Sequence, residues 1–163
     1  MTEPSLASAI RLGVGADELG APLKNYLVRM LANDSNFAMV RDYSEGEADP
    51  TCPYPVVAIR VAQAVALGEI DRGILVCGTG IGMSIAANKV PGVRAAVVHD
   101  GYSAERSVLS NNCQIMTLGA RIIADVSAHR LVKEWLGYEF DPGSASAAKL
   151  QVIEDYERAS GKS

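Results

Sequence analysis

Five short apolar runs alternate along the chain with longer segments whose apolar residues recur every three to four positions. The runs, bounded by glycine and polar residues, predict strands at 11–16, 37–43, 72–78, 93–99 and 113–119. The periodic segments predict helices at 21–33, 55–68, 81–90, 103–110, 125–137 and 144–159. Strands that alternate with helices are typical of right-handed crossovers. We therefore expect an α/β fold, with a five-stranded parallel sheet covered by helices on both faces.

The length and composition predict one ordinary globular domain. With 163 residues, of which 48% are hydrophobic and 21% charged, the chain fits a single core. We expect residues 1–10 to be a flexible leader and residues 11–160 to form the domain. No apolar run reaches the roughly 18 residues that a membrane span needs, so no membrane partner is expected. The start of the chain has no basic cluster before an apolar run, which favours a cytoplasmic protein.

Charge, cysteine and histidine usage narrow the function classes. The cysteines, Cys52, Cys77 and Cys113, fit neither a disulfide framework nor a CxxC knuckle, so reduced thiols are expected. The two histidines, His99 and His129, lack ligand spacing, and we expect no metal. A net charge of -4 argues against nucleic acid as a partner, because phosphate-tracking surfaces are usually basic.

Several polar residues directly follow predicted strands. In parallel α/β sheets, ligands bind beyond the carboxyl ends of the strands. Asp17 follows the first strand, Cys77 ends the third, His99 ends the fourth and Arg121 follows the fifth. These positions predict a ligand site at that edge of the sheet.

The segment CGTGIG at 77–82 is the most informative stretch. Glycines let a backbone approach a ligand closely, and the N–H groups of such a turn favour negative charge. Cys77 faces this turn, so its thiolate is favoured and it is a candidate base or nucleophile, although free cysteines often only fill a core. The dinucleotide fingerprint GxGxxG fails because Met83 stands at its third glycine, and no Walker lysine follows.

The runs CGTGIGMSIAANKVPGVRAA and HDGYSAERSVLSNNCQIMTLGARII resemble the ribose-5-phosphate isomerase B family, which includes galactose-6-phosphate isomerase subunits. The resemblance extends from RLGVGADELGAPLK to EWLGYEF, nearly the whole chain. It implies a Rossmann-like three-layer sandwich and a cofactor-independent aldose–ketose isomerase of small sugar phosphates. It also implies proton transfer through a cis-enediolate. The implied assembly is a homodimer or dimer of dimers, with active sites at the subunit interface.

The resemblance also implies roles for individual residues. Cys77 matches the base that moves the proton, Thr79 its hydroxyl neighbour, and Asn111 the amide that contacts the reacting oxygens. The remaining matches concern substrate binding: N–H groups of the turn including Gly78, Gly80 and Gly82 for the enediolate oxygens, Asp17 for hydroxyls, Tyr54 in the family's DYP segment, and Arg121 for phosphate, expected from the neighbouring subunit.

The chain departs from the family pattern where substrate binds. Ser110 and Glu18 stand where the family generally has histidines, of which the first is assigned to opening a furanose ring. Serine is a poor acid–base substitute for imidazole. The family's phosphate arginines fall on Ser144 and Ala148, next to Lys149.

A substrate that cannot cyclise would not need the missing histidine. Erythrose 4-phosphate and erythrulose 4-phosphate are open-chain, because the hydroxyl that would close a furanose ring is esterified. A tetritol-catabolic subgroup of the family resembles this chain, so isomerisation of D-erythrulose 4-phosphate to D-erythrose 4-phosphate is the leading hypothesis. Lys149 then contacts the phosphate, or it is a solvated lysine at a helix start. His99 is a further candidate for substrate contact.

Three alternatives stay open. One is a ribose 5-phosphate isomerase in which His99 opens the ring. The second is a non-catalytic sugar-phosphate binding protein, because two functional histidines are replaced. The third is a nucleotide-binding domain, which only the glycine turn supports.

Overall fold

The computed structural model describes residues 9–32, 34, 37–44 and 52–161, which form five strands and six helices. Strands and helices alternate from the first strand to the fifth, and a second helix follows α5. The elements are β1 (Ile10–Ala16), α1 (Ala21–Leu31), β2 (Phe37–Asp42), α2 (Tyr54–Ala66), β3 (Arg72–Cys77), α3 (Ile81–Ala87), β4 (Ala95–Val97), α4 (Gly101–Leu109), β5 (Ile115–Gly119), α5 (Asp125–Leu136) and α6 (Ala147–Ala159).

The sheet is parallel throughout and has the strand order β2-β1-β3-β5-β4. The chain builds outward from β1 to β2, then returns to place β3 on the other side of β1. The carboxyl ends of β1 and β3 are therefore neighbours where the strand order reverses, which is where ligands bind in such sheets. The α/β fold with a five-stranded parallel sheet is confirmed.

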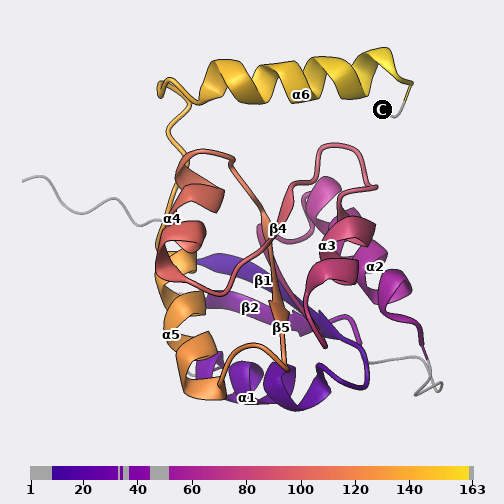
Figure 1. The fold of residues 1–163 in the computed structure, drawn as a ribbon, viewed down its shortest axis with the longest axis vertical. Helices are drawn as coiled ribbons and strands as arrows, with labels where there is room; N and C mark the ends of the chain where they lie inside the picture. Colours follow the sequence, from indigo (N-terminus) through magenta and orange to yellow (C-terminus); the bar gives the residue numbers. More distant parts are fainter. Residues whose placement is uncertain (1–8, 33, 35–36, 45–51, 162–163) are drawn as a thin grey trace, which may run out of the picture.

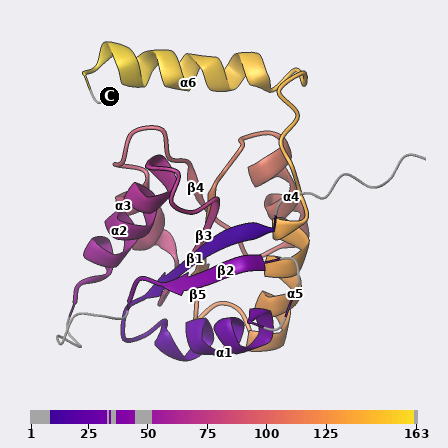
Figure 2. The same ribbon diagram turned by 180° about the vertical axis from the view of Figure 1, so that it is seen from behind.

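Helices cover both faces of the sheet (Figures 1 and 2). An apolar cluster on each face holds them against it. On one face, Leu12, Val14 and Met116 pack with α1, α4 and α5, and the fully buried Trp135 lies in this cluster. On the other face, Leu75 and Ile115 pack with α2 and α3. The strands are buried on both faces because each alternate side chain meets a helix layer.

The last helix stands apart from these layers (Figures 1 and 2). Its one buried residue is Leu150, while Val152 and Tyr156 are 67% and 71% exposed. Glu157 accepts a hydrogen bond from the Gly92 N–H at 3.0 Å, which ties α6 to the loop before β4. Helix α6 thus extends across the amino-terminal edge of the sheet with apolar side chains exposed.

The boundaries differ from the sequence prediction at several ends. β1 begins at Ile10, so the expected leader 1–10 is one residue too long, and residues 1–8 lie outside the described residues. α3 ends at Ala87 rather than at 90, and α6 begins at Ala147 rather than at 144. Across the described residues, no helix is long and apolar enough to cross a membrane.

Candidate active site

The glycine-rich turn joins β3 to α3 at the carboxyl edge of the sheet. Cys77 is the last residue of β3, and its side chain is 6% exposed. Its Sγ accepts a hydrogen bond from the Gly80 N–H at 3.1 Å. A donor aimed at the sulfur stabilises negative charge there, as a catalytic base requires.

Two residues fix the shape of this turn. Gly80 has a φ of 80°, in the left-handed region that favours glycine, and a Cβ there would lie 3.1 Å from the Leu118 backbone. The Thr117 hydroxyl donates to the Gly80 carbonyl at 2.8 Å from the adjacent strand β5. Thr117 is fully buried, so this hydrogen bond is shielded from water. Thr117 was not among the residues predicted from the sequence, although a hydroxyl inside the apolar run CQIMTLG was the available signal.

Replacing Thr117 with valine should test this brace. Valine keeps the shape of threonine but removes one of the two donors to the buried Gly80 carbonyl, which still accepts the Ser84 N–H at 3.1 Å. We expect Thr117→Val to lower the free energy of unfolding by about 0.5–1.5 kcal/mol. Urea denaturation followed by circular dichroism measures this change. An unchanged unfolding midpoint would show that the hydrogen bond contributes nothing to stability.

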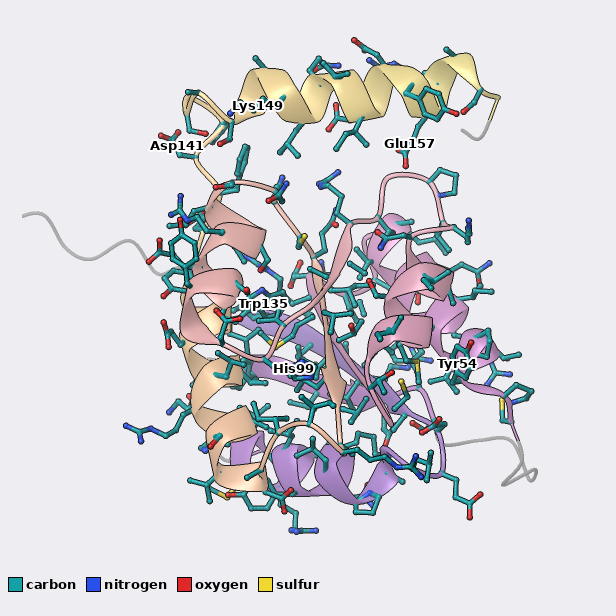
Figure 3. The ribbon with its side chains drawn as sticks, viewed as in Figure 1. Tyr54, His99, Trp135, Asp141, Lys149 and Glu157 are labelled. Carbon is teal, nitrogen blue, oxygen red and sulfur yellow. The ribbon has the colours of Figure 1, made fainter. Side chains whose placement is uncertain are left out.

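Tyr54 and Asp17 lie beside the turn. Tyr54 is the first residue of α2, and a Cβ added at Gly82 would lie 2.5 Å from its ring, so the ring rests directly on that glycine (Figure 3). Asp17 follows β1, where its N–H donates to the Val76 carbonyl at 3.4 Å. The Asp17 carboxylate accepts from the Gly20 N–H at 2.9 Å. These contacts bring an aromatic ring and a carboxylate to the same edge as Cys77.

Hydrogen bonds from residues at and just after the end of β2 hold the end of β1 in place. The Ser44 hydroxyl accepts from the Ala16 N–H at 2.8 Å, and the Ser44 N–H donates to Asp42 at 2.8 Å. Asp42 also pairs with the ammonium of Lys24, and both side chains are largely buried. A buried ion pair with further hydrogen bonds holds a fixed geometry, so the chain just before Asp17 is well positioned.

Thr79 and Arg121 complete the carboxyl edge. Thr79 is exposed, and its hydroxyl accepts from the Ile81 N–H at 3.4 Å. The Arg121 N–H donates to the Gly78 carbonyl at 3.1 Å, and its side chain lies next to Gly78. Arg121 lies beside the turn of its own chain because β5 pairs directly with β3 and ends level with Cys77. Its expected contact with phosphate bound to a neighbouring subunit stays a prediction.

His99 also lies at the carboxyl edge, two residues after the end of β4, so it does not end the fourth strand as the sequence predicted. Its Nε2 accepts a hydrogen bond from the Gly119 N–H at 2.8 Å (Figure 3). Burial lowers the pKa of His99 below its ordinary value of 6.5, and Asp100 acts in the opposite direction. The imidazole is therefore neutral and already bonded to the backbone, which leaves no proton on Nε2 to give to a substrate.

Ser110, Asn111 and Lys149 lie at the opposite edge. The turn after α4 leads into β5, where the Gly73 N–H at the start of β3 donates to the Gln114 carbonyl at 2.9 Å. From Arg72, its first residue, to Cys77, its last, β3 rises about 17 Å at roughly 3.3 Å per residue. Lys149 is exposed near the start of α6, along the same amino-terminal edge (Figure 3). Within one chain, the expected site is therefore divided into two groups.

Ser110 has a charged neighbour at this second edge. The Arg106 guanidinium donates to the Ser110 hydroxyl at 3.2 Å and also pairs with Glu105 at 2.7 Å. Asn111 is exposed. Among the described residues, no three histidine, cysteine or acidic side chains form a group that could hold a metal ion.

The sequence matches a known family over most of its length. The family model described as ribose/galactose isomerase matches residues 12–153. The chain is 50% identical to D-erythrulose-4-phosphate isomerase 2 of Mycolicibacterium smegmatis, with 93% of this chain and 99% of that protein covered. It is 44% identical to D-erythrulose-4-phosphate isomerase of Pectobacterium atrosepticum, with 91% of this chain and 95% of that protein covered.

The fold leads to the same relatives. The ribose-5-phosphate isomerase B structure from Clostridium thermocellum matches with a TM-score of 0.83 and 38% identity, over 92% of this chain and 99% of that one. The family model and these relatives confirm the resemblance recognised in the sequence, and the chain belongs to the ribose/galactose isomerase family of sugar-phosphate isomerases.

Proposed function

We propose that this enzyme interconverts D-erythrulose 4-phosphate and D-erythrose 4-phosphate, with Cys77 as the proton-transferring base. The observation that carries the mechanism is the Cys77 sulfur, which receives the Gly80 N–H at 3.1 Å inside a glycine turn. The substrate is supported by 50% identity to a protein named for that tetrose phosphate.

The reaction needs one base and stabilised oxygens. The Cys77 thiolate removes a proton from C1 of the ketose, which leaves an enediolate with negative charge shared over O1 and O2. The same thiol then returns the proton to C2, and a proton moves from O1 to O2, which gives the aldose. In this mechanism, N–H groups of the turn and the Thr79 hydroxyl stabilise the oxygens, and one such donor can contribute about 3–4 kcal/mol. Asp17 binds substrate hydroxyls beside them.

The residues at the amino-terminal edge support an open-chain substrate. Ser110 and its neighbour Arg106 provide a hydroxyl and a permanent cation there, but no group that titrates near neutrality. A tetrose 4-phosphate needs no acid–base group for ring opening, whereas a cyclic pentose phosphate does. Lys149 on α6 is a second cation at this edge, suited to a phosphate.

A second copy of the chain completes the site in this proposal. Asn111 lies at the amino-terminal edge of the sheet and Cys77 at the carboxyl edge, and β3 spans about 17 Å between these edges, too far for both residues to share one small substrate. The exposed apolar side chains of α6 support association, because such a helix normally packs against another surface. We therefore propose a homodimer, or a dimer of dimers, in which Asn111 of one copy approaches Cys77 of the other.

We propose that the enzyme acts in the cytoplasm. All three cysteines are unpaired, and a reducing compartment keeps thiols in that state. A base of the Cys77 type also requires its thiol to stay reduced.

The second candidate function is ribose 5-phosphate isomerisation. It is favoured by the likeness to the Clostridium thermocellum protein, which is named for that substrate. The two functions differ in whether the site must open a furanose ring.

A direct comparison of substrates tests the proposal. We expect purified protein to convert D-erythrulose 4-phosphate with a kcat/KM at least about tenfold above that for ribose 5-phosphate, a difference of roughly 1.4 kcal/mol. NMR of the aldose and ketose signals, without added metal or cofactor, measures both rates. Faster turnover of ribose 5-phosphate would favour the second function, and binding without turnover of either would leave a sugar-phosphate binding protein.

A further inference from the structure

A histidine joins the end of β4 to the strand that supports the catalytic turn. The Gly119 N–H donates to His99 Nε2 at 2.8 Å. A nitrogen that accepts a hydrogen bond carries no proton, so the imidazole is neutral and its proton is on Nδ1. While this bond exists, His99 cannot contact a substrate through Nε2.

The hydrogen bond between His99 and Gly119 replaces a backbone hydrogen bond that is missing between β4 and β5. The Val98 N–H donates to the Thr117 carbonyl at 3.1 Å, so the next group of β5 that points toward β4 is the Gly119 N–H. β4 ends at Val97, and Asp100 caps the start of α4 by accepting the Ser103 N–H at 2.8 Å. The chain has therefore left the sheet where Gly119 needs an acceptor, and the imidazole supplies it.

Gly119 in turn touches the catalytic turn. It lies opposite Cys77 in the register of β3 and β5, and a Cβ added to it would be 2.7 Å from Thr79 Cα. The next residue, Ala120, donates its N–H to the Cys77 carbonyl at 2.8 Å. A shift of Gly119 would therefore displace both Cys77 and Thr79.

We propose that His99 is a positioning residue whose neutral imidazole replaces the missing strand partner of Gly119 and holds β5 against the catalytic turn. Its catalytic consequence rests on the proposed function, while its effect on the backbone does not. His99 does not touch the reacting atoms in this role. It acts by keeping the base and its hydroxyl neighbour in place, and displacements of about 1 Å at such groups can lower rates a hundredfold.

The surroundings of His99 favour the neutral form of its imidazole. A shallow depression beside His99 is lined by α5 and by the first residue of α4, and its described charged groups are Asp100, Arg130 and Glu134. Burial lowers the pKa of His99 more than Asp100 raises it. Because the folded state prefers the neutral imidazole, this stabilisation is complete above the ordinary value of 6.5 and is lost as pH falls through the lowered pKa.

Two substitutions of His99 separate the effect of its hydrogen-bond acceptor from the effect of its aromatic ring. The glutamine oxygen in His99→Gln reaches about as far as Nε2 and accepts a hydrogen bond at all pH values, whereas His99→Phe keeps a ring without an acceptor. Ser127→Ala is the control, because Ser127 lines the same depression without bonding to Gly119.

The main readout is independent of catalysis. We expect nitrogen NMR of His99 to show an unprotonated Nε2, and amide exchange at Gly119 to become at least about tenfold faster in His99→Phe. His99→Gln and Ser127→Ala should keep the protection. A protonated Nε2 at neutral pH in the unmodified protein would overturn the proposal even if His99→Phe failed to fold.

The turnover rates of these variants should follow the same order as the protection of the Gly119 amide. We expect kcat to fall between about tenfold and a hundredfold in His99→Phe, with KM little changed, and to recover largely in His99→Gln. The positioning role of His99 would also be overturned if the His99→Phe enzyme folded and kept both its kcat and the protection of the Gly119 amide. Absence of isomerase activity in the unmodified protein would instead refute the proposed function, and the NMR and exchange results would still decide the role of His99.

Discussion

Replacing Cys77 with alanine should abolish isomerisation of D-erythrulose 4-phosphate while the fold survives. The methyl group of alanine cannot take a proton from carbon, and general acid–base catalysis contributes about a hundredfold to ten-thousandfold. We therefore expect kcat to fall by about a thousandfold or more. Cys77→Ser should fail similarly, because a serine hydroxyl is a much weaker base than a thiolate.

A second cysteine of this chain provides the control. Cys113 is buried two residues before β5, and burial raises the pKa of its thiol to about 11, so it is protonated and inert at neutral pH. Cys113→Ala should keep its turnover rate, which excludes a general effect of thiol removal. The rates come from NMR of the two sugar phosphates, and circular dichroism checks the fold. Turnover within tenfold of the unmodified enzyme in folded Cys77→Ala would refute Cys77 as the base.

The sequence predicted the sheet well because its signals are local. Each strand is a short apolar run between polar residues, and each of the five predicted runs contains a strand, although β4 covers only Ala95–Val97 of the predicted 93–99. The turn after Cys77 was also recognisable, because only glycine suits the positive φ at Gly80 and the close contact of Gly82 with Tyr54. The helix ends were less accurate, and α6 begins three residues later than expected because Ser144 to Ser146 form turns before it.

The predicted site was less accurate because it depends on which strands are neighbours. Spacing cannot show that β5 lies between β3 and β4, so neither the contact of Arg121 with its own turn nor the brace from Thr117 could be deduced. His99 was placed at the correct edge, but its bond to Gly119 depends on β4 ending early. The resemblance grouped Asn111 with Cys77, whereas α4 carries Asn111 to the opposite edge of its own chain.

That separation leads to the second large effect. If Asn111 of one copy serves Cys77 of another, two inactive variants should restore each other. In a two-fold dimer of Cys77→Ala with Asn111→Ala, one site contains both substitutions and the other contains neither. Random mixing makes half of the dimers mixed, so we expect activity to recover to about one quarter of the unmodified level in the whole mixture and to about one half in isolated mixed dimers. Asn111 is exposed, so its replacement should not disturb folding.

The control pairs two residues of the same edge. Asp17 and Cys77 lie together within one chain, so a mixed dimer of Cys77→Ala with Asp17→Asn has one substitution in each site and should stay inactive. Co-expression with two affinity tags isolates the mixed dimers, and isomerisation of D-erythrulose 4-phosphate measures recovery. Recovery in the first pair alone would place Asn111 across a subunit boundary from Cys77. Isolated mixed dimers that remain inactive in both pairs would refute the shared site, because one complete site per dimer is the minimum that this arrangement must provide.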